Sequence, residues 1–289
     1  MGASLRDIRK RISSVKSTQQ ITKAMKMVAA AKLRRAEQRA RSFSPYAAGL
    51  ESVLQSAMSR LEGELTIPLA TPKTTHGAVI LLVAGDRGLC GGYNSNIFRI
   101  ATRYMAEHQG EDLRWVAVGK KAIEWVRKRG LQVLAEHAGM RQPPLPQDIE
   151  AIGQQLVRPF LDGEVGSAVA IYNRFVSAMT QVPEARVLLP FATSLEEDKP
   201  AAVGYPFLLD GSPAELVSEL VEQVFQAAIM RVILEAQAGE HGSRMTAMDS
   251  ATTNAAEMIG RLTLVYNRAR QAAITNELMD IVNGSESLK

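Results

Sequence analysis

The C-terminal stretch of the chain, from Pro213 onward, carries a helical pattern of unusual length. No proline follows Pro213. Ser212 can cap a helix, Pro213 suits its first position, and Glu215 stands where a capping box places a carboxylate. Asn283-Gly284 predicts the end of this helix. A helix of that length spans roughly 100 Å at about 1.5 Å per residue, so it needs a partner along its course.

Apolar and small residues recur at alternating spacings of three and four in both terminal stretches. In the C-terminal stretch the series comprises Met245, Met248, Thr252, Ala255, Ile259, Leu262, Tyr266, Ala269 and Ala273. In the N-terminal stretch it comprises Leu5, Ile8, Ile12, Val15, Gln19, Thr22, Lys26, Ala29, Leu33, Ala36, Ala40 and Phe43. Both series are heptad seams diluted by small or polar residues, which brings helices close while burying little apolar area. The two seams predict one antiparallel coiled coil.

The N-terminal helix has its own boundary signals. Ser4 and Asp7 stand at capping-box spacing. Pro45 interrupts the pattern, but the same spacing resumes after it, which favours a kinked continuous helix over a break. Gly63 is the predicted stop. Residues 1–62 are therefore predicted to form the first strand of the coiled coil.

The middle of the chain follows another pattern. A Pro- and Thr-rich linker (66–77) precedes the short apolar run AVILLVA (78–84), which has the length of a buried strand. Strands are further expected at 113–118, 131–135, 167–175 and 184–189, and helices at 97–107, 121–129 and 147–158. This alternation predicts a mostly parallel sheet with crossover helices. The expected fold is α/β: a Rossmann-like domain (75–209) inserted between the coiled-coil segments 1–62 and 210–289.

Charge is distributed unevenly along the chain. The net charge is +4, but residues 1–41 hold twelve Lys and Arg against two acidic residues. A basic helix of this kind attracts nucleic acid, an acidic protein partner or anionic headgroups. No aromatic residue precedes Phe43 and no nucleic-acid-binding motif is present, so a protein partner is preferred. One cysteine excludes an internal disulfide, and we expect neither a transmembrane segment nor a secretory signal.

Candidate chemistry is confined to the glycine-rich stretch GDRGLCGGYN (85–94). It follows a predicted strand, where a phosphate-binding loop would lie, but it matches neither GxxxxGK nor GxGxxG. A tight turn requiring positive φ is the alternative, and a loop docking on a partner is preferred to both. Cys90 has no histidine at a spacing typical of nucleophilic catalysis. The sequence predicts no catalytic residue, metal site or cofactor.

Four motifs resemble the gamma subunit of F-type ATP synthase, and their order along the chain agrees with that family. They are ITKAMKMVAAAKLRRA (21–36), GDRGLCGGYN (85–94), RMTAMDSATTNA (244–255) and LVYNRARQAAITNEL (264–278).

The resemblance implies a non-catalytic rotor shaft of the central stalk. Such a shaft turns inside a ring of alpha and beta subunits and meets the epsilon subunit and the membrane c-ring. It couples proton flow to ATP synthesis or hydrolysis on beta. The resemblance also implies a peripheral protein on the cytoplasmic face of a bacterial inner membrane. A basic coiled-coil nucleic-acid-binding protein is the alternative.

The resemblance also assigns contacts to single residues. It implies coupling contacts with beta at Met25, Lys26, Arg244, Gln271, Thr275 and Glu277. It implies a partner-docking loop at Asp86, Arg87, Gly88, Leu89, Cys90 and Gly91. Lys26 stands where some relatives carry an acidic residue. The resemblance does not explain Gly239 and Gly242 inside the last helix, and a flexible joint is the interpretation considered for them.

Overall fold

The computed structural model describes residues 4–58, 68–191 and 213–286. The chain divides into two compact units. The first combines residues 1–28 with 245–289, and the second comprises residues 29–244. None of the helices in the described part of the chain is long and apolar enough to cross a membrane.

Two long helices, α1 (Leu5–Met58) and α5 (Pro213–Glu286), contribute to both units. The Ser4 hydroxyl accepts a hydrogen bond from the Asp7 backbone N–H at 3.2 Å, as the predicted cap requires. Helix α1 continues through Pro45, which agrees with the preserved heptad spacing.

The predicted end of α5 at Asn283-Gly284 is wrong, because the helix continues to Glu286. A helical glycine costs only about 1 kcal/mol, and it ends a helix only by adopting a left-handed conformation. The predicted stop at Gly63 and the cap at Ser212 lie outside the described residues.

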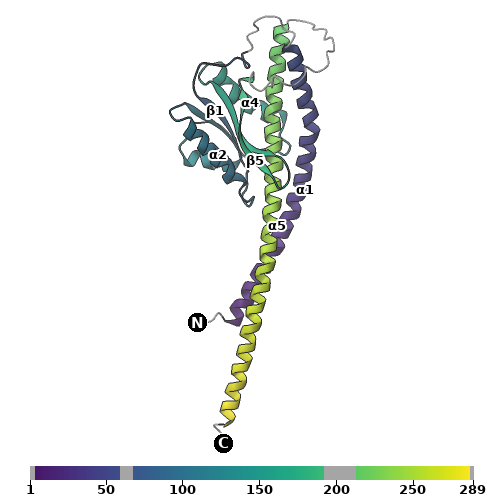
Figure 1. The fold of residues 1–289 in the computed structure, drawn as a ribbon, viewed down its shortest axis with the longest axis vertical. Helices are drawn as coiled ribbons and strands as arrows, with labels where there is room; N and C mark the ends of the chain where they lie inside the picture. Colours follow the sequence, from purple (N-terminus) through teal and green to yellow (C-terminus); the bar gives the residue numbers. More distant parts are fainter. Residues whose placement is uncertain (1–3, 59–67, 192–212, 287–289) are drawn as a thin grey trace. The chain divides into compact units, whose positions relative to one another are not determined.

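The first unit is a pair of antiparallel helical segments (Figure 1). The Thr22 and Thr252 hydroxyl oxygens lie 2.8 Å apart across the seam. One turn further along α1, the Lys26 ammonium and the Asp249 carboxylate lie 2.6 Å apart. The diluted seam predicted from the heptads is therefore held in register here by polar contacts.

The second unit is built on a five-stranded sheet in the order β3-β2-β1-β4-β5. The strands are β1 (Ala78–Val83), β2 (Leu113–Val118), β3 (Val133–His137), β4 (Ser167–Phe175) and β5 (Gln181–Leu189). β1 pairs in parallel with β2 and β4, and β2 with β3, whereas β5 is antiparallel to β4. This mixed sheet, with helices between its parallel strands, confirms the predicted fold class.

Element boundaries differ from the predicted ones by a few residues. The strand expected at 184–189 begins three residues earlier, so that Gln181, Val182 and Pro183 are part of β5. Proline is tolerated there because β5 is an edge strand, where a missing backbone N–H disrupts little. Strand β3 begins at Val133, two residues after its predicted start. Just before the strand, the Gln132 backbone carbonyl accepts a hydrogen bond from the Trp115 backbone N–H at 2.8 Å.

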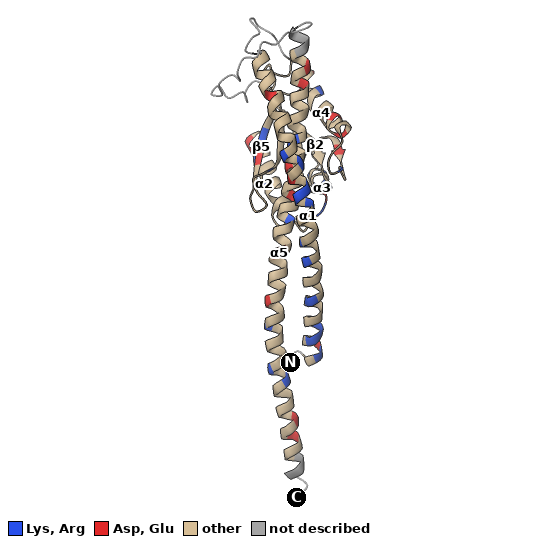
Figure 2. Cartoon of the chain, turned by 90° about the vertical axis from the view of Figure 1, so that its right-hand side faces the viewer, with Lys and Arg blue, Asp and Glu red and all other residues tan. Residues whose placement is uncertain are grey.

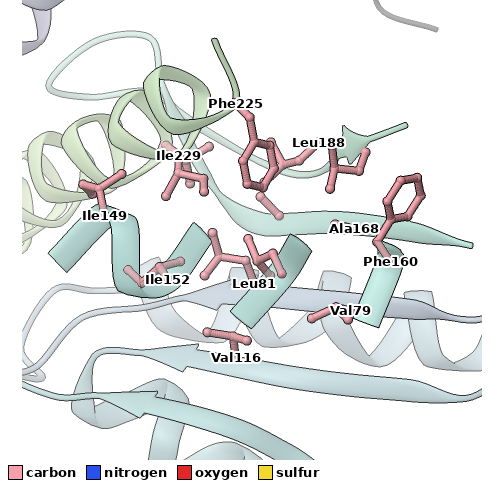
Figure 3. Close-up of a cluster of buried hydrophobic side chains, with 14 of the residues drawn as sticks. Val79, Leu81, Val116, Ile149, Ile152, Phe160, Ala168, Leu188, Phe225 and Ile229 are labelled. Carbon is pink, nitrogen blue, oxygen red and sulfur yellow. The ribbon is translucent and has the colours of Figure 1, made fainter. Parts of the chain in front are cut away.

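Side chains of β1 alternate between two cores on opposite faces of the sheet. Val79, Leu81 and Val83 face a cluster shared with α4 (Pro146–Leu161) and α5. Figure 3 shows Ile149 and Ile152 of α4 and Phe225 and Ile229 of α5 converging on this face.

Side chains of the other parity face the second core. Ile80 and Leu82 pack with Trp115 and with α2 (Tyr93–Glu107) and α3 (Lys120–Lys128). The α5 residues that belong to these two cores, from Val217 to Ala236, all belong to the first of them, so this part of α5 is a core element of the second unit.

Gly239 and Gly242 lie where α5 meets strands β4 and β5 and their connecting turn. A Cβ on Gly239 would stand 3.2 Å from the Tyr93 ring, and one on Gly242 would stand 2.9 Å from the Ala178 carbonyl oxygen. Both glycines are helical and buried. The expected flexible joint is therefore wrong, since the missing side chains permit close approach of α5 to the strands.

Replacing Gly242 by alanine is expected to destabilise the chain by about 1–3 kcal/mol, because the new methyl group meets backbone that cannot move aside cheaply. Gly49 in α1 is the matched control. It is helical and its Cβ position is open, so Gly49→Ala should stabilise the chain by about 0.5–1 kcal/mol. Urea midpoints of the purified chain measure both. Equal shifts in the two variants would contradict the packing role.

Candidate functional site

The glycine-rich loop (84–92) connects the carboxyl end of β1 to α2. Its path is unusual: Leu89 has φ +60° and Gly91 has φ +57°, which costs Leu89 roughly 1 kcal/mol. The Asp86 carboxylate fixes one side of the loop by accepting hydrogen bonds from the Lys120 and Gly139 backbone N–H groups, each at 3.0 Å. The loop is therefore tied to the ends of the neighbouring strands.

Helix α5 occupies the crevice at the carboxyl ends of the strands, where open α/β sheets commonly bind ligands. The Tyr93 hydroxyl donates to the Ala236 carbonyl at 2.8 Å, and a Cβ on Gly85 would stand 3.0 Å from the Glu240 carboxyl carbon. The hollow left here measures about 30 Å³, which is room for about one water molecule. A nucleotide phosphate has no space in this hollow.

Arg244 attaches the loop to α5. Its guanidinium pairs with the Glu240 carboxylate at 2.5 Å, and each of these side chains is only 12% exposed. The same guanidinium reaches the backbone carbonyls of Arg87 and Gly88 at 3.4 Å. The structure thus brings together Arg244 and the predicted docking loop, through contacts within the chain.

His241 completes this cluster as a neutral imidazole. Its Nε2–H donates to the Gln142 side-chain oxygen at 3.0 Å, while Nδ1 faces the Arg244 guanidinium at 3.5 Å. Burial, with smaller contributions from Arg244 and Lys32, lowers the pKa of His241 to about 4. The imidazole therefore stays uncharged beside Arg244 at neutral pH.

Cys90 is a buried structural thiol. Its sulfur accepts a hydrogen bond from the Asn94 amide at 3.3 Å, and burial raises the pKa of the thiol, with Arg244 opposing the rise. A raised thiol pKa disfavours the nucleophilic thiolate. Leu89 beside it is 66% exposed and points the loop's apolar tip outward from the buried sulfur. Among the described residues no cluster of three or more His, Cys, Asp or Glu could hold a metal ion.

The other predicted contact residues lie in the first unit, in two groups that are separated along α5. Met25 is half-buried, and Lys26 is held by Asp249 across the seam. Gln271, Thr275 and Glu277 are exposed on α5, more than 20 residues beyond Asp249, which is roughly 33 Å of helix. Their roles toward a partner stay predictions.

Sequence reasoning missed the acidic and histidine partners of Arg244. Glu240 stands four residues before Arg244, a spacing at which a helical ion pair could have been foreseen. No local signal marks Gln142, because only the folded chain brings it to His241.

Substituting Arg244 by methionine should destabilise the chain by about 3 kcal/mol, because it leaves the buried Glu240 carboxylate without its partner. The double variant Arg244→Met/Glu240→Gln should recover part of that loss, and Glu240→Gln alone is the control. Urea unfolding of the three variants provides the comparison. A double variant no more stable than Arg244→Met would contradict the pairing.

His241 predicts a pH dependence. Because its folded pKa of about 4 lies below the unfolded value of about 6.5, the unfolded state binds more protons between these values. Stability is therefore complete above about pH 6.5 and falls as the pH drops, by about 2 kcal/mol between pH 7.5 and pH 5. His241→Gln should lose this component while retaining a donor to Gln142. Urea midpoints at both pH values test it; identical pH dependence in the two proteins would refute it.

Comparisons with known proteins agree with the sequence motifs. A family model described as ATP synthase matches residues 4–288. The curated ATP synthase gamma chain of Geobacter sp. strain M21 is 44% identical over 99% of both chains, and that of Moorella thermoacetica is 42% identical over 99% of this chain and all of the relative.

Solved structures share the fold. The central stalk and c-ring structure of the Tetrahymena thermophila mitochondrial ATP synthase contains a chain that matches with a TM-score of 0.61 and 24% identity, covering 80% of this chain and 99% of its own. A chain of the Euglena gracilis mitochondrial ATP synthase matches with a TM-score of 0.65 and 21% identity, covering 98% and 94%. The family model and the full-length bacterial relatives confirm the predicted family: the chain belongs to the ATP synthase gamma chain family.

Proposed function

We propose that this chain is the central-stalk rotor of an F-type ATP synthase and catalyses no reaction itself. It couples proton flow through a membrane c-ring to ATP synthesis or hydrolysis on beta subunits. Its partners are the alpha–beta hexamer, an epsilon subunit and the c-ring. The bacterial relatives support a place on the cytoplasmic face of the inner membrane, where the chain is held through these partners.

The observation that carries the proposal is the end of α5. Extending the Thr22–Thr252 register places Leu5, the first residue of α1, opposite about Ala269. Beyond that point α5 has no helical partner among the described residues (Figure 1). Yet the large apolar residues of this part of α5 each have about half or more of their surface exposed: Ile274, Leu278, Met279, Ile281 and Val282.

An apolar helix end of this kind needs to be surrounded. A sleeve of partner subunits covers it without requiring interlocked side chains, which a turning shaft must avoid. In this part of α5, apolar residues alternate with polar Gln271, Thr275 and Glu277. The apolar residues provide a surface that partner subunits can cover, and the polar residues can form specific contacts with those subunits.

Charge supports an acidic sleeve around the other helix. Figure 2 shows Lys and Arg residues along α1, whereas the last part of α5 carries few charges. In the first unit, Lys26 alone among the basic residues of α1 has a carboxylate within ion-pair distance in the described structure. The remaining cations are free to meet acidic segments of beta, as the family resemblance implies.

In this proposal, rotation of the chain is coupled to the state of a beta subunit through a difference in contact energy between the beta conformations. A shaft changes the equilibrium of a beta subunit only if its contacts differ between the beta conformations. The exposed residues Gln271, Thr275 and Glu277 are suited to such contacts because they are not engaged in the packing of the chain. Leu89 and Arg87, exposed on the docking loop, would form a second level of contact, and Arg244 would hold that loop in place.

The nucleic-acid alternative is set aside. Its only support was the basic N-terminal helix, and the gamma chain family accounts for that helix without nucleic acid.

Assembly and pumping test the proposal directly. The chain, expressed with the alpha, beta and epsilon subunits and the membrane sector of its own organism, should co-purify with them. Vesicles containing the complex should pump protons on addition of ATP. Proton pumping by a complex that lacks this chain would contradict the proposed role.

The triple variant Gln271→Ala/Thr275→Ala/Glu277→Ala should lower the number of protons pumped per ATP hydrolysed several-fold, since a loss of about 1.4 kcal/mol of coupling is worth a factor of ten. The matched control changes three other exposed positions of α5, Thr253, Asn254 and Glu257, to alanine. Pumping and hydrolysis are measured in the same vesicles. An equal effect of both triples, or no effect of either, would remove these residues from the coupling contacts.

A further inference from the structure

Helices α2 and α3 form the outer layer on one face of the sheet in the second unit. Their apolar sides belong to the second core, whereas α4 and the buried part of α5 cover the opposite face (Figure 1). Four exposed basic residues stand on this layer: Arg99 and Arg103 on α2, Lys128 at the end of α3, and Arg129 directly after it. These four residues are called the α2–α3 basic surface.

The charges of the α2–α3 basic surface are unpaired. Two neighbouring cations do have partners, since Lys121 pairs with Glu124 at 2.7 Å and Arg127 pairs with Glu136. In the described part of the chain, no carboxylate lies within ion-pair distance of any of the four residues of the surface. Their charge is therefore available to an anion from outside the chain.

On α2, the placement of the two arginines is unfavourable for the helix alone. Arg99 and Arg103 are four residues apart, a spacing at which like charges destabilise a helix. Glu107 follows Arg103 at the same spacing, but these two side chains form no ion pair in the described structure. An anion lying across this turn of α2 would offset the repulsion between the arginines.

An aromatic stack positions the cation at the end of α3. The Phe98 and Trp125 rings stack with their centres 5.3 Å apart and an angle of 13° between their planes. The Arg129 guanidinium lies 4.1 Å from the centre of the Trp125 ring. A cation–π contact of this kind holds the guanidinium in place but leaves its charge and its N–H groups able to bind an anion.

We propose that the α2–α3 basic surface lies against the membrane surface and binds the phosphate groups of anionic phospholipids. The guanidinium groups of Arg99, Arg103 and Arg129 donate hydrogen bonds to phosphate oxygens, and Lys128 adds a mobile positive charge. This proposal rests on the proposed function, because that function places the chain beside a membrane.

The motion of the chain favours a lipid surface over a stationary protein as the occupant. A rotor carries this outer layer past each stationary subunit once per turn, so a fixed protein contact would have to break in every revolution. A fluid layer of headgroups presents equivalent phosphates at every angle. Attraction of clustered cations to an anionic surface needs no fixed partner geometry, so it is compatible with rotation.

Photo-crosslinking in the complete ATP synthase tests the proposal. Thr102 is replaced by p-benzoylphenylalanine, because it is exposed next to Arg103 and its hydroxyl bonds only the Phe98 carbonyl of its own helix, at 2.8 Å. The enzyme is reconstituted into vesicles with equal amounts of phosphatidylglycerol and phosphatidylcholine, and one of the two lipids carries a radiolabel. The expected adduct of this chain contains phosphatidylglycerol several-fold more often than phosphatidylcholine.

Charge and salt should both control the yield of that adduct. In Arg103→Glu/Lys128→Glu it should fall at least about fivefold, because each reversal turns attraction to the anionic headgroups into repulsion. Raising the KCl concentration from about 0.05 M to about 0.3 M should lower it as well, since the screening length shortens.

Arg141→Glu/Arg158→Glu is the matched control, with the same charge change at two exposed residues outside the α2–α3 layer. It should leave the yield unchanged. An assembled enzyme that gives no lipid adduct, an adduct with a protein subunit in its place, equal labelling by the two lipids, or equal yields in the two double variants would overturn the lipid proposal. Failure of the chain to co-purify with the complex would instead contradict the proposed function.

Discussion

A single helix has to serve two opposite purposes, and this constraint shapes the rest of the structure. Between Val217 and Ser243, α5 is largely buried against the sheet and α1. After Asp249 most of its positions are exposed. The buried half must be fixed firmly enough to transmit torque, while the exposed half must present a surface that moves past other proteins. Both demands are met by side-chain choice on one continuous helix.

The buried half is fixed by close approach and by paired charge. Gly239 and Gly242 let the strands come within contact distance of the helix backbone, and Glu240 and Arg244 tie the glycine-rich loop to the helix one turn apart. A neutral His241 occupies the space between Arg244 and Gln142. Helix α5 fills the crevice at the carboxyl ends of the strands, where other α/β domains of this kind bind nucleotides. In this protein the α/β domain therefore holds the long helix in place of a ligand.

Much of the fold could be predicted from the sequence, since periodicity reports burial directly. The apolar run of β1 and the heptads of α1 and α5 are signals of that kind. The start of β5 could not be predicted, because Pro183 is compatible with a strand only at the sheet edge, and edge position depends on the whole topology. The glycines of α5 were misinterpreted for a similar reason: their neighbours, Tyr93 and Ala178, are distant in the sequence. At the site, motifs identified the loop and Arg244, but not that the two contact each other.

Rotation is the central claim, and it can be observed directly. A probe attached through a cysteine introduced at exposed Arg103, in a chain whose buried Cys90 is replaced by serine, would report the motion of this chain against an immobilised alpha–beta hexamer. During ATP hydrolysis the account predicts unidirectional rotation of the probe. Continued hydrolysis with the probe stationary would contradict it.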